Sequence, residues 1–141
     1  MKKVLVGAAA AVLFCTGVGT AAADAWHRLP DMRPDGVLFF EGQYQFNPPE
    51  RNHGAFEWRG KLQDTLPDDG HNVYMQARAE GHGWSRYNGK QRRTVSLHHS
   101  NWDGAQRYTD NAEIRACRDR GSLRPDNCSP VAERHGPEWA R

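Results

Sequence analysis

The side chains with the most chemical potential in this sequence lie near position 100. His98 and His99 are followed by Asp103 and Asp110, and imidazole with carboxylate is a ligand set for transition metals. Because adjacent side chains of a strand point to opposite faces, only one of the two histidines can join a given site. His99 and Asp103 are therefore the metal candidates, with Tyr108 expected across a hairpin from His99. A solvated loop rim explains these residues more simply, so no metal and no other cofactor is expected.

Aromatic residues offer a second kind of chemistry, since an exposed ring can stack on a sugar or anchor a protein partner. Tyr74 is predicted on the polar face of a strand, and Trp84, Tyr87 and Trp102 are in or beside predicted loops. These four are the candidate ligand-binding residues. The alternative is that the tryptophans only cover the ends of the fold.

Oxygen ligands are also grouped in the sequence. Asp64, Asp68, Asp69 and Asn72 could hold calcium, although their spacing is not that of a calcium loop and a tight turn needs the same residue types. No serine elbow, metalloprotease helix or phosphate loop is present. The sequence leaves open a glycosidase mechanism, in which two acidic side chains act on a glycosidic bond. No catalytic residue is predicted, and a non-catalytic role is favoured.

The first 23 residues have the pattern of a secretory signal peptide. Lys2 and Lys3 precede an apolar run at 4–18, and small residues allow cleavage after position 23 or 25. The run is shorter than the roughly 20 residues of a membrane span, so no membrane attachment is expected after cleavage. The sequence therefore predicts a secreted protein.

Cleavage changes both the charge and the cysteine count. The chain has 19 Lys and Arg against 17 Asp and Glu, and the leader contains two of the lysines and no acid. The remaining chain is close to neutral, which argues against a nucleic-acid partner. Cys15 is lost with the leader, which leaves Cys117 and Cys128. In an oxidising compartment the two should form a disulfide, and closing a loop of about a dozen residues is worth on the order of 3 kcal/mol.

Alternating polarity predicts the strands that must position these residues. In the stretch 55–80, apolar residues share one face on either side of Asp69-Gly70, a pair suited to a tight hairpin turn. A two-residue turn there places Leu62 opposite Ala77. By the same test 37–46 is a strand with Leu38 and Phe40 facing inward.

Two more turn signals follow, at Asn88-Gly89 and Asp103-Gly104. The first leaves the register one residue out of phase, and Gly81 and Gly83 are the expected site of a compensating bulge. The second places Val95, in a strand at 93–100, opposite Ala112, in a strand at 111–117.

Together these segments predict an all-β fold, a single antiparallel β-sandwich or small barrel of about five to eight strands. The expected division is a signal peptide at 1–23, an irregular lead-in at 24–36, a β domain at 37–130 with a disulfide loop at 117–128, and an irregular tail at 131–141. No amphipathic helix and no internal repeat is evident.

The leader, the turn at 68–70, the segment VYMQAR at 73–78 and the ending ACRDRG at 116–121 through DNCS at 126–129 resemble small secreted actinobacterial proteins of unknown function. The resemblance covers about the last two thirds of the chain. It implies secretion and a disulfide-closed β domain, and it transfers no active site.

The functional hypothesis is a small secreted module that binds an extracellular or cell-envelope glycan or a protein through loops and exposed aromatics. The first alternative is a secreted enzyme inhibitor that presents the loop 118–127, because a closed loop loses less freedom on binding. The second alternative is a metal-dependent secreted enzyme with its metal at His99. The sequence leaves the ligand and the oligomeric state open.

Overall fold

The computed structural model describes residues 26–136, so the predicted signal peptide at 1–23 and its cleavage sites lie outside the described residues. The described chain forms nine strands and one short 3-10 helix, η1 (Asn52–Gly54). The strands are β1 (His27–Arg28), β2 (Val37–Phe46), β3 (Phe56–Asp64), β4 (Val73–Ala79), β5 (Ser85–Asn88), β6 (Thr94–Asn101), β7 (Asn111–Arg118), β8 (Asn127–Cys128) and β9 (Ala132–His135).

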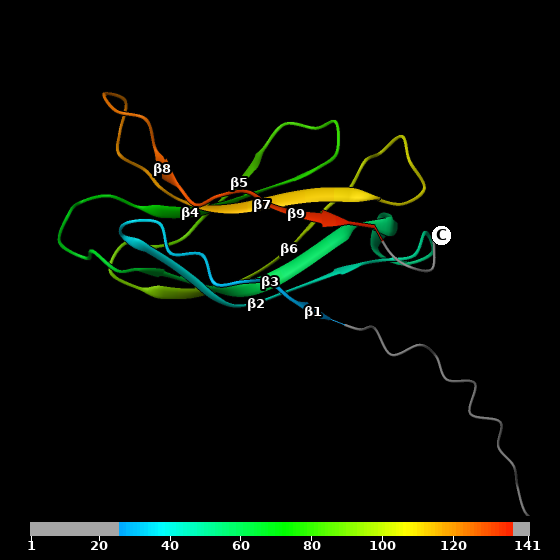
Figure 1. Ribbon diagram of the computed structural model, residues 1–141, viewed down its shortest axis with the longest axis horizontal. Helices are drawn as coiled ribbons and strands as arrows, with labels where there is room; N and C mark the ends of the chain where they lie inside the picture. Colours follow the sequence, from blue (N-terminus) through cyan, green and yellow to red (C-terminus); the bar gives the residue numbers. More distant parts are fainter. Residues whose placement is uncertain (1–25, 137–141) are drawn as a thin grey trace, which may run out of the picture.

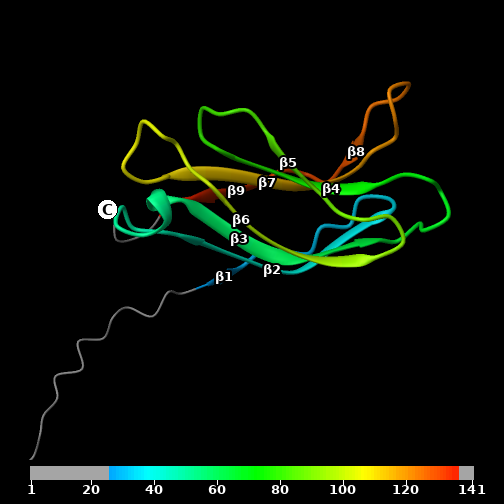
Figure 2. The same cartoon turned by 180° about the vertical axis from the view of Figure 1, so that it is seen from behind.

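The strands form two antiparallel sheets that lie face to face (Figures 1 and 2). Sheet A has the order β1-β2-β3-β6, and sheet B has the order β5-β4-β7 with β8 and β9 both paired to β7. The predicted β-sandwich is confirmed. Within residues 26–136, no helix has the length and apolar character that crossing a membrane requires.

The core lies between the layers, and the predicted inward faces of three strands are confirmed. Fully buried Phe56, Trp58 and Leu62 alternate along β3 with half-buried polar residues. Alternate residues of β4 and β7 face them from sheet B, with Met75 and Ile114 fully buried. A strand with one buried face carries its apolar residues at every second position. The alternating pattern in the sequence therefore predicts the buried face.

The predicted hairpin at 55–80 is wrong. Leu62 pairs with Phe39 and Val95 within sheet A, whereas Ala77 pairs with Ser85 and Ile114 within sheet B. Residues 65–72 therefore carry the chain from one layer to the other instead of closing a ladder. Parity cannot separate the two cases, because a strand paired beside another and a strand packed across from it both turn their apolar face to the same core.

The hairpin predicted across Asp103-Gly104 is wrong for the same reason. Val95 pairs with Leu62 and not with Ala112, because residues 102–110 again connect sheet A to sheet B. The hairpin predicted across Asn88-Gly89 is wrong as well, because β5 before it pairs with β4 in sheet B and β6 after it pairs with β3 in sheet A. The compensating bulge expected at Gly81 and Gly83 is therefore absent, and residues 81–83 lie in the turn between β4 and β5.

The register irregularity of sheet A lies in β2. The pairing with β3 shifts between Phe40 and Gln43, and Glu41 has a φ of 52°, in the left-handed region. Before this bulge the inward residues are Val37 and Phe39, so the predicted inward positions of Leu38 and Phe40 are wrong. An extra residue reverses the parity of a strand, and Gly42, within the shifted segment, is the one local sign of it in the sequence.

Both ends of the described chain contain more pairing than predicted. In the lead-in, β1 pairs with β2, and Met32 forms a bridge with Phe39. In the tail, β9 extends sheet B beside β7. These segments are short edge pieces, and an edge strand has too few buried positions to show a period.

Candidate functional site

The outer face of sheet A is hollowed into a groove of about 790 Å³. β2, β3, β6 and the segment before β2 contribute to it. Its lining residues are Trp26, Arg28, Asp31, Phe40, Glu41, Gly42, Gln43, Arg59, Gly60, Lys61, Ser96, Leu97 and His98.

Local strand geometry explains which side chains reach the groove. In β3 the inward positions of Trp58 and Leu62 turn Arg59 and Lys61 to the outer face. In β2 the bulge at Glu41 leaves Phe40 on the outer face, although it sits in an apolar run. Phe40 therefore adds a second aromatic ring to the groove, beside Trp26.

Trp26 forms one wall of the groove. The guanidinium carbon of Arg59 lies 4.0 Å from the Trp26 ring centroid, a cation–π contact. The imidazole of His98 meets the same ring edge-on, with 5.8 Å between centroids. The indole is thus held over β3 by Arg59 of β3 and His98 of the neighbouring strand β6.

Hydrogen bonds and ion pairs hold the charged groove residues in place. The Nε of Arg59 donates to Oε1 of Gln43 at 2.9 Å. Lys61 Nζ pairs with a carboxylate oxygen of Glu41 at 2.9 Å and lies 5.8 Å from the centroid of the Phe40 ring. These contacts order long side chains, and they leave further N–H donors of both cations directed at solvent or a ligand.

Glu57 anchors the His98 end of the site. Its carboxylate lies 2.6 Å from Nε2 of His98 and also accepts hydrogen bonds from the amides of Gln45 (2.9 Å) and Asn47 (3.0 Å). Burial by itself raises the pKa of Glu57, but the hydrogen bonds from Asn47, His98 and Gln45 together hold it below its usual value. The carboxylate is therefore a fixed negative partner for His98.

The four aromatic residues singled out from the sequence do not line this groove. Tyr74 is buried, against the prediction that it lies exposed, and its hydroxyl is hydrogen-bonded to Asp126. Tyr87 stacks on His99 with centroids 4.0 Å apart, and its hydroxyl accepts a 2.7 Å hydrogen bond from Asn101. Both rings have structural partners that limit their access to a ligand.

The two tryptophans of this set lie apart from each other and from the groove. Trp84 lies between the guanidinium groups of Arg78 and Arg115, at 4.2 and 4.5 Å from its ring centroid, on the outer face of sheet B. Trp102 is 43% exposed and stacks on His53 at 4.5 Å. No single ligand surface gathers the four rings.

The metal candidates are each engaged elsewhere. His99 is stacked between the layers, and burial, with a smaller effect of nearby His98, lowers its pKa. Asp103 accepts the backbone N–H of Ala105 and lies 3.2 Å from Nε2 of His82, and both contacts lower its pKa. In the part of the chain that the structure describes, no group of three or more His, Cys, Asp or Glu side chains is arranged to hold a metal ion.

In the candidate calcium loop, Asp64 and Asp69 use carboxylate oxygens to accept backbone N–H groups. Asp64 is buried, and its two carboxylate oxygens accept the N–H groups of Leu66 and Arg92, both at 3.0 Å. Asp69 accepts the N–H of His71 at 2.8 Å. These bonds fix the crossing between the two layers.

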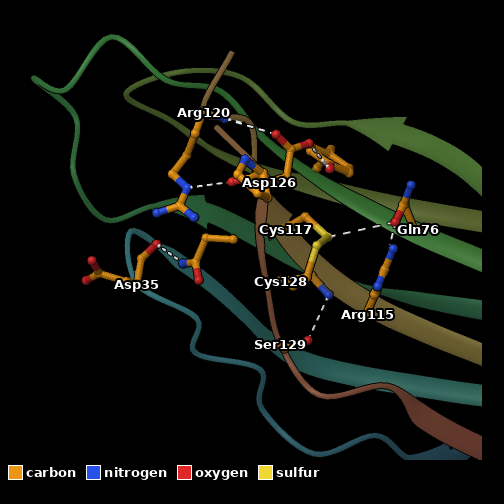
Figure 3. The surroundings of a disulfide bond; sticks show 12 residues. Asp35, Gln76, Arg115, Cys117, Arg120, Asp126, Cys128 and Ser129 are labelled. Carbon is orange, nitrogen blue, oxygen red and sulfur yellow. Dashed lines mark hydrogen bonds between the residues drawn. A yellow bond between two sulfur atoms is a disulfide. The ribbon is translucent and has the colours of Figure 1, made fainter. Parts of the chain in front are cut away.

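The predicted disulfide between Cys117 and Cys128 is present, with the two Cα atoms 4.0 Å apart (Figure 3). It closes a loop that projects from sheet B, drawn in orange in Figure 1. The carboxylate of Asp126 ties this loop to the sandwich, because it accepts hydrogen bonds from the backbone of Arg120 and from the hydroxyl of Tyr74. At the tip, Leu123 is 95% exposed.

No family model matches this chain, and neither does any curated protein or solved structure. The functional argument therefore starts from the geometry of the groove and the loop. The sequence reading missed Trp26 and Arg59 as site residues. Trp26 lies in a proline-containing segment without a period, and Arg59 belongs to an alternation that also describes an ordinary solvated face.

Proposed function

We propose that this protein is a secreted, non-catalytic module that binds an extracellular or cell-envelope glycan in the groove of sheet A. The single observation that carries the proposal is the Trp26 indole held over Arg59 at the wall of a 790 Å³ groove. The site is therefore the outer face of β2, β3 and β6 rather than the four loop aromatics expected from the sequence.

The groove combines the two kinds of contact that sugar recognition requires. An aromatic ring packs against the C–H face of a pyranose, and Trp26 and Phe40 are both available for this. Hydroxyl and carboxylate groups need fixed donors and acceptors, which Arg59, Gln43 and Lys61 supply. An open groove across three strands suits an extended chain better than a small enclosed ligand.

The arrangement also lowers the cost of binding. Immobilising a long side chain costs about 0.5–1.5 kcal/mol at an interface. Here Gln43 already orders Arg59, and Glu41 already orders Lys61. A ligand then meets side chains that already have hydrogen-bond or ion-pair partners in the free protein.

The proposal is tested by titrating the protein with a panel of bacterial envelope and plant polysaccharides and following tryptophan fluorescence and heat. For a ligand that binds, Trp26→Ala is expected to weaken affinity about tenfold or more, since a lost aromatic stack costs about 1.4 kcal/mol or above. Trp102→Ala is the matched control, because it removes an exposed tryptophan outside the groove and should leave affinity unchanged.

Two results would contradict the proposal. One is the absence of any heat or fluorescence change across the panel. The other is a ligand whose affinity falls with Trp102→Ala and is indifferent to Trp26→Ala, which would move the site to the loops.

A second candidate function, inhibition of a secreted enzyme, is favoured by one observation. Leu123 is 95% exposed at the tip of a loop that the disulfide and Asp126 hold in shape. Such a rigid, exposed side chain fits insertion into the specificity pocket of a protease. Extracellular proteases should be inhibited by the native protein and not by Leu123→Asp, with Ser122→Thr as the control. Inhibition that survives Leu123→Asp would reject this mode.

A further inference from the structure

Strand β6 forms a long open edge of sheet A, because among the strands of residues 26–136 it pairs only with β3 (Figure 2). Soluble proteins usually keep edge strands short or place lysine, proline or a bulge on them, since free N–H and C=O groups recruit other strands. The other edge strands follow this rule, with two residues each in β1 and β8 and four each in β5 and β9. β6 has eight residues, contains no lysine or proline, and pairs without a register shift.

Two hydrogen bonds establish which backbone groups of β6 are free. The N–H of Asn47 donates to the carbonyl of Ala55, so odd-numbered residues of β3 turn their backbone groups toward β2. The N–H of Asp64 donates to the carbonyl of Arg93, so even-numbered residues of β3 and odd-numbered residues of β6 face each other. The residues of β6 with backbone groups pointing into the open edge are Thr94, Ser96, His98 and Ser100.

We propose that β6 pairs antiparallel with β6 of a second copy, so that two copies of sheet A form one continuous sheet across a two-fold axis. The outward groups of one strand must meet the outward groups of the other. A register centred on Leu97 of both copies achieves this over the whole strand. It sets Thr94 against Ser100 and Ser96 against His98 of the second copy.

The side chains of β6 are compatible with pairing between two copies of this strand. β6 contains no Asp, Glu, Lys or Arg, so a self-pairing brings no fixed like charges together. A register centred on His98 would set two imidazoles face to face, whereas the Leu97 register places each opposite a serine. Leu97, which is only partly buried in one copy, would cover its equivalent in the other.

The pairing would also join the two grooves. Ser96, Leu97 and His98 line the groove at its β6 side, so it reaches the edge where the second copy docks. Two grooves would then lie on the same face of one sheet, in opposite directions. The dimer itself does not depend on the identity of the groove's ligand, and its test uses the protein alone.

The first test is the mass of the purified, oxidised protein in solution across a concentration series, by light scattering and sedimentation. A monomer–dimer equilibrium is expected. Ser96→Pro should abolish the dimer, because proline removes an N–H that points into the open edge and leaves the ladder to β3 intact. Thr94→Lys should weaken it by placing a charge on the same edge, and Ser122→Lys, the same type of change in the disulfide loop, should not.

Amide hydrogen exchange tests which backbone N–H groups of β6 bond to the second copy. It uses the unmodified protein, so it does not depend on whether Ser96→Pro folds. At low concentration the amides of Ser96 and His98 should exchange rapidly, while those of Leu97 and His99 are protected by β3. Raising the concentration should slow the first pair and leave the second pair unchanged. A protein that stays monomeric at every concentration, or a dimer unaffected by Thr94→Lys and without new protection at Ser96 and His98, would overturn the proposal.

Discussion

The hydrogen bond from Tyr74 to Asp126 ties sheet B to the base of the disulfide loop. The ring is buried on β4 and is covered by the guanidinium of Arg86, 3.7 Å from its centroid. Burial, together with the hydrogen bond and the negative charge of Asp126, raises the pKa of Tyr74 from its usual 10.0 to about 12. The neutral phenol is therefore the form that the folded protein stabilises.

Tyr74→Phe is expected to lower the free energy of unfolding by about 1–2 kcal/mol at neutral pH, because it leaves the partly buried Asp126 one donor short. The folded pKa is raised, so the tyrosine's contribution is complete below pH 10 and is lost as the pH rises from 10 toward 12. Urea unfolding of both proteins across this range should show the difference shrinking. A difference that stays constant with pH would contradict this account of the Tyr74 pKa.

Among the strand elements, β2 and β3 each contain a glycine, Gly42 and Gly60, that leaves room for the ring of Phe39 on the inner face of sheet A. A Cβ added to Gly60 would lie 2.3 Å from an atom of this fully buried ring, and one added to Gly42 would lie 2.5 Å from another. Phe39 in turn packs edge-on against Trp58, with 6.2 Å between centroids. The backbone of the same two glycines lines the groove on the other side of the sheet.

Gly60→Ala has two opposing effects on the free energy of unfolding. Removing a glycine from a strand interior is stabilising by roughly 0.5–1 kcal/mol through the lost chain flexibility. Forcing a methyl group into the Phe39 ring costs typically about 1–3 kcal/mol. The steric effect is larger, so we expect net destabilisation by about 1 kcal/mol or more in thermal or urea unfolding. Gly83→Ala, with nothing within 4 Å of its Cβ, is the control and should be neutral or stabilising.

At the scale of the whole molecule, the two proposed functions use features that belong to opposite layers. The groove lies on the outer face of sheet A, and the disulfide loop projects from sheet B. Three connections, at 65–72, 89–93 and 102–110, cross between the layers, and the chain enters and leaves β6 through the last two. β6 lies at an open edge of sheet A. This topology makes both the groove and the edge accessible to partners at the same time.

The sequence by itself determined the local features. It placed the strands at 37–46 and 111–117 within a residue of their observed bounds, identified the inward faces of β3, β4 and β7, and paired Cys117 with Cys128. Each of these depends on residues close together in the chain or on a choice with one solution. A half-buried strand must alternate, and two remaining cysteines can pair in only one way.

Only the tertiary structure decided which strands are neighbours and what the outer faces do. Leu62 and Ala77 face the same core whether their strands pair in one sheet or lie in opposite sheets. Which of the two arrangements has the lower free energy depends on every other strand. Tyr74 is covered by Arg86, 12 residues later in the chain, and by Asp126, a further 40 residues on. Trp26 becomes a groove wall only because folding brings Arg59 and His98 beneath it. Such contacts leave no period in the sequence, since each joins one residue to another at an arbitrary separation.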